Sequence, residues 1–287
     1  MDQNSVSISQ RNYIEESTAK FHIGTSMRYK TPIPLGIDFT ALMDMDEEKE
    51  ESKNFPYCEL IGSLMYTATV SRPDIAYSVN KLARYSSKPS CTHWNLAKRV
   101  LQFLYNTHDK SLILGGNEPN LYAYANTDFA GDTNDRTSTG GYAIFLGNRV
   151  VSWLSKKQSI IALSSTEAEY IVLSEAAWEI LWLCRFLQEI GIKIDNPTTI
   201  YQDNLGTKAF ALDEKSPRCM KHIEVKYHFI KTHIAQNIFK IVYTPSSQMT
   251  ADIFTKFLPP FKHAFHSNAL NLTTLLLKGV CEGTSVE

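Results

Sequence analysis

The feature that most constrains the fold is a change of hydrophobic period between residues 119–154 and residues 164–190. In the first range apolar and polar residues alternate, and turn residues at Gly140-Gly141 and Gly147-Asn148-Arg149 divide the range into short runs. Alternation with intervening turns is typical of antiparallel strands. In the second range apolar residues recur at helical spacing. The pattern therefore predicts a three-stranded antiparallel meander followed by one long helix.

The predicted long helix has recognisable ends and two apolar stripes. Ser164 can cap its first turn with Glu167 as the capping-box partner, and Gly191 is a typical residue to end it. The stripes consist of Trp178, Trp182 and Phe186 on one side, and of Val172, Ala176, Ile180, Leu183 and Leu187 on the other. A helix that is apolar over so much of its surface is expected to be buried against a sheet.

Strands and helices alternate after this long helix. Residues 198–203 and 238–244 are predicted strands, and a short helix and a longer helix near residues 218–236 lie between them. Pro245-Ser246-Ser247 is predicted to open a last helix, which carries Asp252. This order predicts an α/β fold in which a mixed five-stranded sheet is flanked by helices.

The part of the chain before the meander has a different character. Residues 1–37 show no long period, and acidic residues crowd the stretch 44–51, which predicts a solvated linker. Residues 56–108 have apolar residues at helical spacing on both sides of Lys88-Pro89-Ser90, so we expect a small helical region there. We predict that these helices serve packing and carry no chemistry.

Composition excludes several classes of protein. The chain has 287 residues, 43% of them hydrophobic, and a formal net charge of −1, which indicates a globular protein and excludes a generally basic nucleic-acid coat. A local basic groove remains compatible with this charge. The 5 cysteines lie far apart, which predicts reduced thiols in an intracellular protein. The apolar runs are shorter than a membrane span, and the N-terminus does not resemble a signal peptide.

Acidic side chains lie at the ends of several predicted elements, at Asp128, Glu169, Asp203 and Asp252. Asp203 occupies the carboxyl end of a strand, where open α/β sheets place ligands. Carboxylates that meet at one sheet edge repel each other unless a cation joins them, and oxygen-only clusters suit magnesium or manganese. Any one of these carboxylates alone is more typical of a surface group or a cap. Their combination is what indicates a metal site for phosphoryl transfer.

Several long motifs follow each other in a fixed order between residues 57 and 272. The first is YCELIGSLMYTATVSRPDIAYSVNKLARYSSKP, and the later ones are AGDTNDRTSTGGYAIFLG, VSWLSKKQSIIALSSTEAEYIVLSEAAWEILWL, IYQDN, KHIEVKYHFI and TADIFTKFL. The first resembles the region that joins reverse transcriptase to RNase H in the Pol polyprotein of copia-type LTR retrotransposons, and the later ones resemble the RNase H domain itself. ISQRNYIEESTAKF resembles the end of the preceding polymerase region. The polymerase motif Tyr-x-Asp-Asp is absent, so we expect a 5′-truncated fragment.

The resemblance implies an RNase H fold with an Asp-Glu-Asp-Asp site for two Mg²⁺ ions, with Mn²⁺ as the alternative. Glu169, Asp203 and Asp252 match the second, third and fourth carboxylates, and they are the expected metal ligands.

The first carboxylate departs from the family pattern, which usually reads Tyr-Ser-Asp-Ala-Asp-Trp-Ala-Gly. In an ungapped alignment Asn126 falls on the first Asp, which is the ligand, and Asp128 falls on the second. Asn126 keeps an oxygen but has no charge, so we expect weak or absent catalysis. Asp128 lies about 6.5–7 Å further along the same strand face, so it could replace the ligand only if the strand slipped or bulged.

Basic residues near the predicted helices indicate a nucleic-acid surface. Lys156 and Lys157 follow the third strand, and Lys221 belongs to a basic stretch that also contains His222 and His228. We predict that the three lysines contact phosphates, with an ordinary solvated helix face as the alternative. The two histidines are poorly spaced for a zinc site.

These observations predict four segments and one main function. The segments are a polymerase-tail remnant and acidic linker at 1–55, a helical connection region at 56–118, an RNase H-like domain at 119–258 and a C-terminal tail at 259–287. The expected function is hydrolysis of the RNA strand of an RNA/DNA hybrid. The alternatives are a non-catalytic relic that binds nucleic acid weakly and, less favoured, an integrase-type nuclease. We expect a reverse transcriptase in trans as a further partner, no membrane, and a cytoplasmic virus-like particle as the location if the chain is expressed.

Overall fold

The computed structural model describes residues 5–37, 39, 55–115, 119–132, 134–194, 197–212 and 224–274. The acidic stretch 44–51, Lys221 and His222 therefore lie outside the described residues. Of the five cysteines, Cys58, Cys91 and Cys184 are described, and all three are free thiols. None of the helices in the described ranges is long and apolar enough to cross a membrane.

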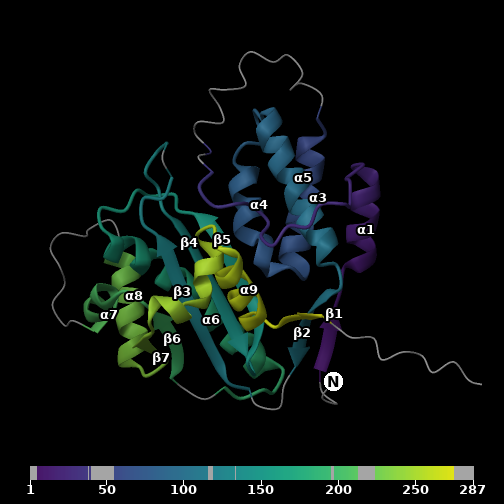
Figure 1. Cartoon of the computed structure of the whole chain (residues 1–287). Coiled ribbons are helices and arrows are strands. Elements are labelled where there is room, and N and C mark those ends of the chain that lie inside the picture. The colour runs from purple at the N-terminus through teal and green to yellow at the C-terminus, as the bar shows by residue number, and fades with distance from the viewer. Residues whose placement is uncertain are drawn as a thin grey trace, which may run out of the picture.

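A five-stranded sheet forms the centre of the larger part of the molecule (Figure 1). Its strands lie in the order β5-β4-β3-β6-β7, and they comprise β3 Leu121–Asp128, β4 Thr139–Leu146, β5 Arg149–Lys157, β6 Thr198–Gln202 and β7 Phe239–Tyr243. The pairs β3-β4 and β4-β5 are antiparallel, whereas β3-β6 and β6-β7 are parallel. This arrangement confirms the predicted RNase H-like mixed sheet, including the antiparallel meander that begins it.

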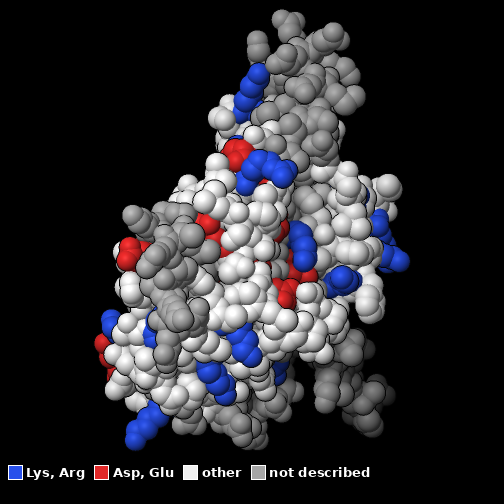
Figure 2. All heavy atoms as spheres, turned by 90° about the vertical axis from the view of Figure 1, so that its left-hand side faces the viewer, with Lys and Arg blue, Asp and Glu red and all other residues white. Residues whose placement is uncertain are grey.

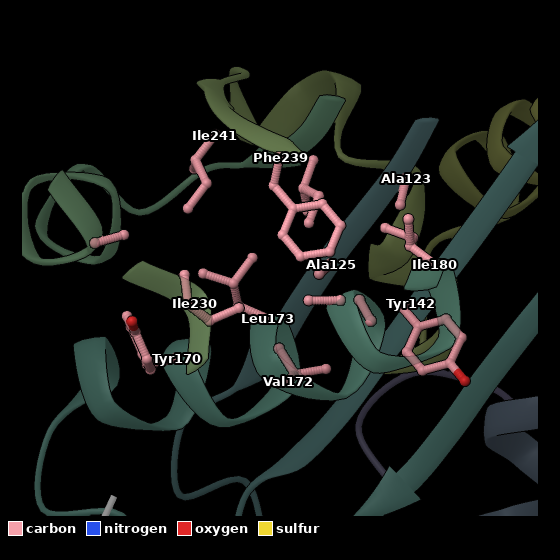
Figure 3. Packing of buried hydrophobic residues seen from close by; sticks show 14 of the residues in the cluster. Ala123, Ala125, Tyr142, Tyr170, Val172, Leu173, Ile180, Ile230, Phe239 and Ile241 are labelled. Carbon is pink, nitrogen blue, oxygen red and sulfur yellow. The ribbon is translucent and has the colours of Figure 1, made fainter. Parts of the chain in front are cut away.

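The long helix α6, Ser165–Glu189, covers one face of the sheet. Its first turn is capped as predicted, because the Ser164 hydroxyl accepts a hydrogen bond from the Glu167 amide at 3.2 Å. The Glu167 carboxylate in turn accepts from the Leu163 amide at 2.9 Å. Helices α7, Leu205–Leu212, and α8, Glu224–Ala235, complete this layer. Figure 3 shows side chains of α6, including Val172 and Leu173, in one apolar core with residues of β3, β7 and α8.

Only one of the two apolar stripes of α6 is buried. Ile180 is fully buried in the core, as predicted, but Trp178 is 62% exposed and Trp182 is 57% exposed. The Trp178 ring stacks on Phe229 of α8, with ring centroids 4.7 Å apart. The prediction that both stripes are buried was wrong, because α6 lies in an outer layer and turns only one face toward the sheet.

The opposite face of the sheet is covered by short 3-10 helices and by α9, Pro260–Ala269, which is yellow in Figure 1. The 3-10 helices η4, Ser246–Gln248, and η5, Thr250–Phe254, replace the single last helix that we expected. A Cβ atom on Gly141 of β4 would lie 2.4 Å from the Cβ of Phe254, so glycine is needed there for η5 to approach the sheet. This contact brings Asp252 close to the central strands.

The N-terminal part of the chain, up to Asn106, forms a helical region beside the sheet (Figure 1). It consists of α1 Arg11–Lys20, α3 Tyr57–Val70, η2 Pro73–Ile75, α4 Ala76–Ala83 and α5 Cys91–Asn106. Helices were predicted within residues 56–108, but α1 was not, because it buries only a short stretch of its surface around Ile14.

A second sheet was also not predicted. Its strands have the order β1-β2-β8, and they comprise β1 Ser5–Ile8, β2 Lys110–Gly115 and β8 Leu272–Thr274. These strands come from three of the four predicted segments, and the predicted segment boundaries stay predictions. Because each strand is short and pairs only with distant parts of the chain, no local pattern indicates the sheet.

Candidate active site

The candidate site is built around the end of β3, where Asn126 lies. Side chains alternate along a strand, so Ala125 faces α6 while Asn126 faces η5. The Asn126 side chain is 3% exposed, and its Nδ2 donates a hydrogen bond to Oδ1 of Asp252 at 2.5 Å. A longer contact of 3.5 Å joins the same Nδ2 to the Thr255 hydroxyl. The amide is thus fixed against a carboxylate.

Asp252 is brought to Asn126 by η5 and is buried. Its Oδ1 also accepts from Nζ of Lys256 at 2.9 Å, and the Lys256 side chain is half-exposed. Burial raises the pKa of Asp252, and the Lys256 ammonium counteracts that shift. One carboxylate oxygen in this half of the site therefore already has two donors from the protein.

Glu169 approaches the same strand end from the other face of the sheet. It lies in the first turns of α6 and is buried, and its Oε1 accepts from the backbone amide of Thr127 at 3.2 Å. Its Oε2 is buried without a hydrogen-bond partner among the described residues. Burial raises the pKa of Glu169 well above its usual range, and the carboxylates of Asp203 and Asp252 raise it further. Glu169 is thus a buried acid whose charge the protein neutralises poorly.

Asp203 follows β6 directly, and its position results from the parallel pairing of β6 with β3. The pairing sets Tyr124 opposite Tyr201, whose rings stack with centroids 4.8 Å apart. β6 ends at Gln202, and Asp203 is the next residue. The Asp203 Oδ2 accepts from the Ser246 hydroxyl at 2.7 Å. The Asp203 charge raises the pKa of both Glu169 and Asp252, so the three carboxyl groups influence one another.

Asp128 has other neighbours. Its carboxylate accepts from the Thr139 amide at 2.5 Å, inside the β3-β4 hairpin. Burial raises the pKa of Asp128 to about 7, against the opposing effects of this hydrogen bond and of the cations of Lys81 and Arg84. Gly131 leaves room for this carboxylate, because a Cβ atom there would lie 2.1 Å from its Oδ2. The structure therefore places Asn126, and not Asp128, beside Asp252.

The donor atoms at one side of this site are of the kind that a divalent cation would bind. Within the described ranges no group of three or more His, Cys, Asp or Glu side chains is arranged to hold a metal ion, so the predicted ligand set stays a prediction. Glu169 nevertheless has an Oε2 without a partner among the described residues, and the Asp203 carboxylate raises the pKa of the Glu169 side chain. Carboxylate oxygens are the ligands that suit Mg²⁺ or Mn²⁺. The Asp252 side is less suited, because an amide and an ammonium group occupy its Oδ1.

The lysines that were predicted to bind nucleic acid differ in their surroundings. Lys157 forms ion pairs with Asp132 at 3.2 Å and with Asp135 at 2.7 Å, so its charge is largely used inside the protein. Lys156 lines a shallow pocket with Lys226 and Glu175. Figure 2 shows the Lys and Arg side chains of the described residues in separate groups on the face that carries α7 and α8. The phosphate contacts of these lysines stay predictions.

Sequence reasoning missed Lys256 as a member of the site. A signal for it existed, because Asp252 and Lys256 have the i, i+4 spacing of a helical ion pair. Ser246 was also missed. It contacts Asp203 only through the fold, and no local pattern indicates that contact.

Comparison with known proteins shows what the chain is similar to. No protein-family model matches it. It is 35% identical over 277 residues to the retrovirus-related Pol polyprotein from transposon RE2 of Arabidopsis thaliana, which covers 96% of this chain and 18% of that protein. It is 34% identical over 254 residues to the corresponding polyprotein from transposon TNT 1-94 of Nicotiana tabacum, across 88% of this chain and 19% of that protein. The chain thus spans less than a fifth of the length of these relatives.

Among solved structures, a similar one is the crystal structure of LC11-RNase H1 in complex with an RNA/DNA hybrid. The two share 16% identity with a TM-score of 0.36, over 47% of this chain and 93% of the other.

Proposed function

Since the chain belongs to the Pol polyproteins of copia-type LTR retrotransposons and contains their RNase H domain, we propose that it hydrolyses the RNA strand of RNA/DNA hybrids at a low rate. The observation that supports this proposal is that the charges of Asp203 and Asp252 both raise the pKa of the buried Glu169 carboxyl group. The low rate follows from Asn126, which stands where a fourth carboxylate would complete the set.

The side chains of the site have separate tasks in this proposal. Glu169 and Asp203 would hold a Mg²⁺ or Mn²⁺ ion, which when bound supplies Lewis-acid activation of water and neutralises the leaving oxygen. The Thr127 amide holds one Glu169 oxygen, so that the unpartnered Oε2 is the one available as a ligand. Ser246 orients Asp203 through a hydrogen bond of 2.7 Å. Asn126 and Lys256 fix the Asp252 carboxylate.

Asn126 weakens the site by removing charge and by adding a donor. At an effective dielectric constant near 20, a unit charge about 4 Å away contributes about 4 kcal/mol per unit of cation charge. Loss of even part of that attraction slows the reaction on the order of a thousandfold. In addition, the Asn126 amide donates to Asp252, whereas a carboxylate could only accept. A second cation is therefore disfavoured at the Asp252 side.

The proposed substrate is bound by its backbone and its 2′-hydroxyl groups, so sequence specificity is expected to be low. The scattered basic groups and the net charge of −1 support weak binding by this chain alone. A reverse transcriptase that acts in trans would supply additional contacts to the hybrid.

A second candidate function is a non-catalytic module that only binds nucleic acid. The contacts that favour it are those of Asn126 and Lys256 to Asp252, because they satisfy one oxygen of that carboxylate without a metal.

A cleavage assay separates the two functions. The chain would be incubated with an RNA/DNA hybrid labelled at one end of the RNA, in Mg²⁺, in Mn²⁺ and in EDTA. Slow cleavage that requires a metal and disappears in Glu169→Gln supports the nuclease. Hybrid binding without cleavage in either metal supports the non-catalytic module. Circular dichroism of both proteins verifies that the substitution leaves the fold intact.

A further inference from the structure

The helical region contains a second basic site that shares no residue with the candidate active site. An open cavity of about 420 Å³ lies between α5 and residues 22–29, the segment that follows α1. We propose that this cavity binds the phosphate group of a nucleotide, either free or within a nucleic-acid strand. The inference does not depend on the proposed nuclease activity, because no residue of the five-stranded sheet contributes to the cavity.

The described side chains that line the cavity include cations and no acidic group. Lys98 and Arg99 line it together with His22, and none of the lining residues is acidic. Neither Lys98 nor Arg99 forms an ion pair with a carboxylate among the described residues, unlike Lys81 and Arg84, which both pair with Asp132. Two adjacent cations without a counter-ion in a hollow favour an anionic ligand.

The two cations lie against aromatic rings, and no carboxylate of the described residues forms an ion pair with either of them. The guanidinium carbon of Arg99 lies 3.8 Å from the centroid of the Tyr29 ring. The Lys98 ammonium lies 5.6 Å from the centroid of the Trp94 ring. Nη2 of Arg99 donates a long hydrogen bond to the Thr31 carbonyl oxygen at 3.4 Å, and the Arg99 side chain also forms a hydrogen bond with Tyr29. Its buried Nε has no partner among the described residues. A stacked guanidinium with free N–H groups suits the oxygens of a phosphate.

The wall opposite α5 is preformed. The Gln102 amide donates to the Gly24 carbonyl oxygen, and the Asn106 amide donates to the Met27 carbonyl oxygen at 2.8 Å. These two bonds fix residues 22–29 across α5, so the cavity does not need to be organised by its ligand. Such preorganisation lowers the entropic cost of binding.

The other lining residues indicate a nucleotide and not a bare inorganic anion. Ile23 and Met27 give the cavity an apolar side, and Asn95 adds an amide near the cations. Met27 is 58% exposed, so its side chain is free to pack against a sugar or a base. The volume also falls within the range of about 300–1,000 Å³ that is usual for small-molecule sites.

Binding can be measured on the full chain by fluorescence anisotropy with a labelled single-stranded oligonucleotide. EDTA in the buffer keeps metal-dependent binding at the candidate active site out of the measurement. We expect Lys98→Glu to weaken binding at least tenfold and Arg99→Gln to weaken it similarly. Lys193→Glu is the matched control, because it makes the same change of charge at an exposed residue outside the cavity. Equal binding by Lys98→Glu and the natural chain, or equal weakening by Lys193→Glu, would overturn the proposal.

Competition with AMP and with inorganic phosphate identifies the ligand. Competition by AMP at lower concentration than phosphate supports a nucleotide site that accepts free nucleotides. Failure of both to compete, with the Lys98→Glu defect present, supports a site for a nucleotide within a strand. If phosphate competes as well as AMP, the apolar wall contributes nothing and the nucleotide assignment is wrong. Because Lys98 is only half-buried, its substitution should leave the chain folded even if Arg99→Gln does not.

Discussion

The candidate active site has an Asp252 half and a Glu169 half, and they differ in how the protein offsets the charge of the buried carboxylate. Asp252 receives an amide from Asn126 and an ammonium group from Lys256, so the protein itself offsets its charge. Glu169 receives one backbone amide, and its second oxygen is buried without a partner beside another acid. The difference teaches that protein donors can neutralise one carboxylate of a group and leave another without such donors. Among the described residues, an ammonium group contacts the Asp252 carboxylate, whereas only a backbone amide contacts that of Glu169.

The largest effect is expected when an acid is restored at position 126, beside Asp252. Asn126→Asp should raise the rate of hybrid cleavage on the order of a thousandfold, because it replaces a donor to Asp252 by a charge that attracts a cation. The rate is measured by single-turnover cleavage in Mg²⁺. An inactive but folded Asn126→Asp protein would show that damage elsewhere limits the reaction, and would favour the non-catalytic module.

A smaller effect should appear in metal binding by the natural chain. We expect Glu169→Gln to weaken Mn²⁺ binding at least tenfold, which corresponds to about 1.4 kcal/mol. Asp252→Asn should weaken it by less than about threefold, because the donors of Asn126 and Lys256 already occupy Oδ1. Isothermal titration without nucleic acid measures both. Equal losses in the two variants would show that the halves do not differ.

In the absence of metal, Glu169→Gln and Asp252→Asn should change the free energy of unfolding by different amounts. Glu169→Gln is expected to stabilise the fold by about 1 kcal/mol in EDTA, because it removes an acid whose ionisation burial opposes and keeps an acceptor for the Thr127 amide. Asp252→Asn should change stability by less than about half as much, since Lys256 already offsets the cost of burying that charge. Urea unfolding at neutral pH measures both. A destabilised Glu169→Gln protein would contradict the assignment.

Substitution of Asp128 is expected to have the smallest effect on catalysis. It should also change how the stability of the fold depends on pH. Its pKa of about 7 in the folded protein exceeds the ordinary value of 3.8, so the folded state holds the proton more tightly than the unfolded state does. The contribution of this group to stability should therefore fall as pH rises from about 4 to about 7. Asp128→Asn should flatten that decline, and should change cleavage by the Asn126→Asp protein by less than about twofold. Loss of cleavage in Asp128→Asn would identify Asp128 as the first carboxylate.

The sequence alone was sufficient for most of the sheet that positions the site. Alternation and turn residues predicted β3, β4 and β5, and cap residues predicted where α6 begins. Such features depend on contacts between residues that are close in the chain, and these appear in the sequence as a regular spacing of apolar residues. The resemblance to copia-type polyproteins then indicated the positions of Glu169, Asp203 and Asp252.

Only the tertiary structure decided which side chains meet. Both stripes of α6 have the same helical period, so their spacing could not show that Ile180 is buried while Trp182 is exposed. Asn126 and Asp128 lie on the same face of β3, and only the approach of η5 to one of them separates their roles. The sheet β1-β2-β8 joins the two ends of the chain to its middle. In each case the deciding energy comes from contacts between residues far apart in sequence, which no local period records.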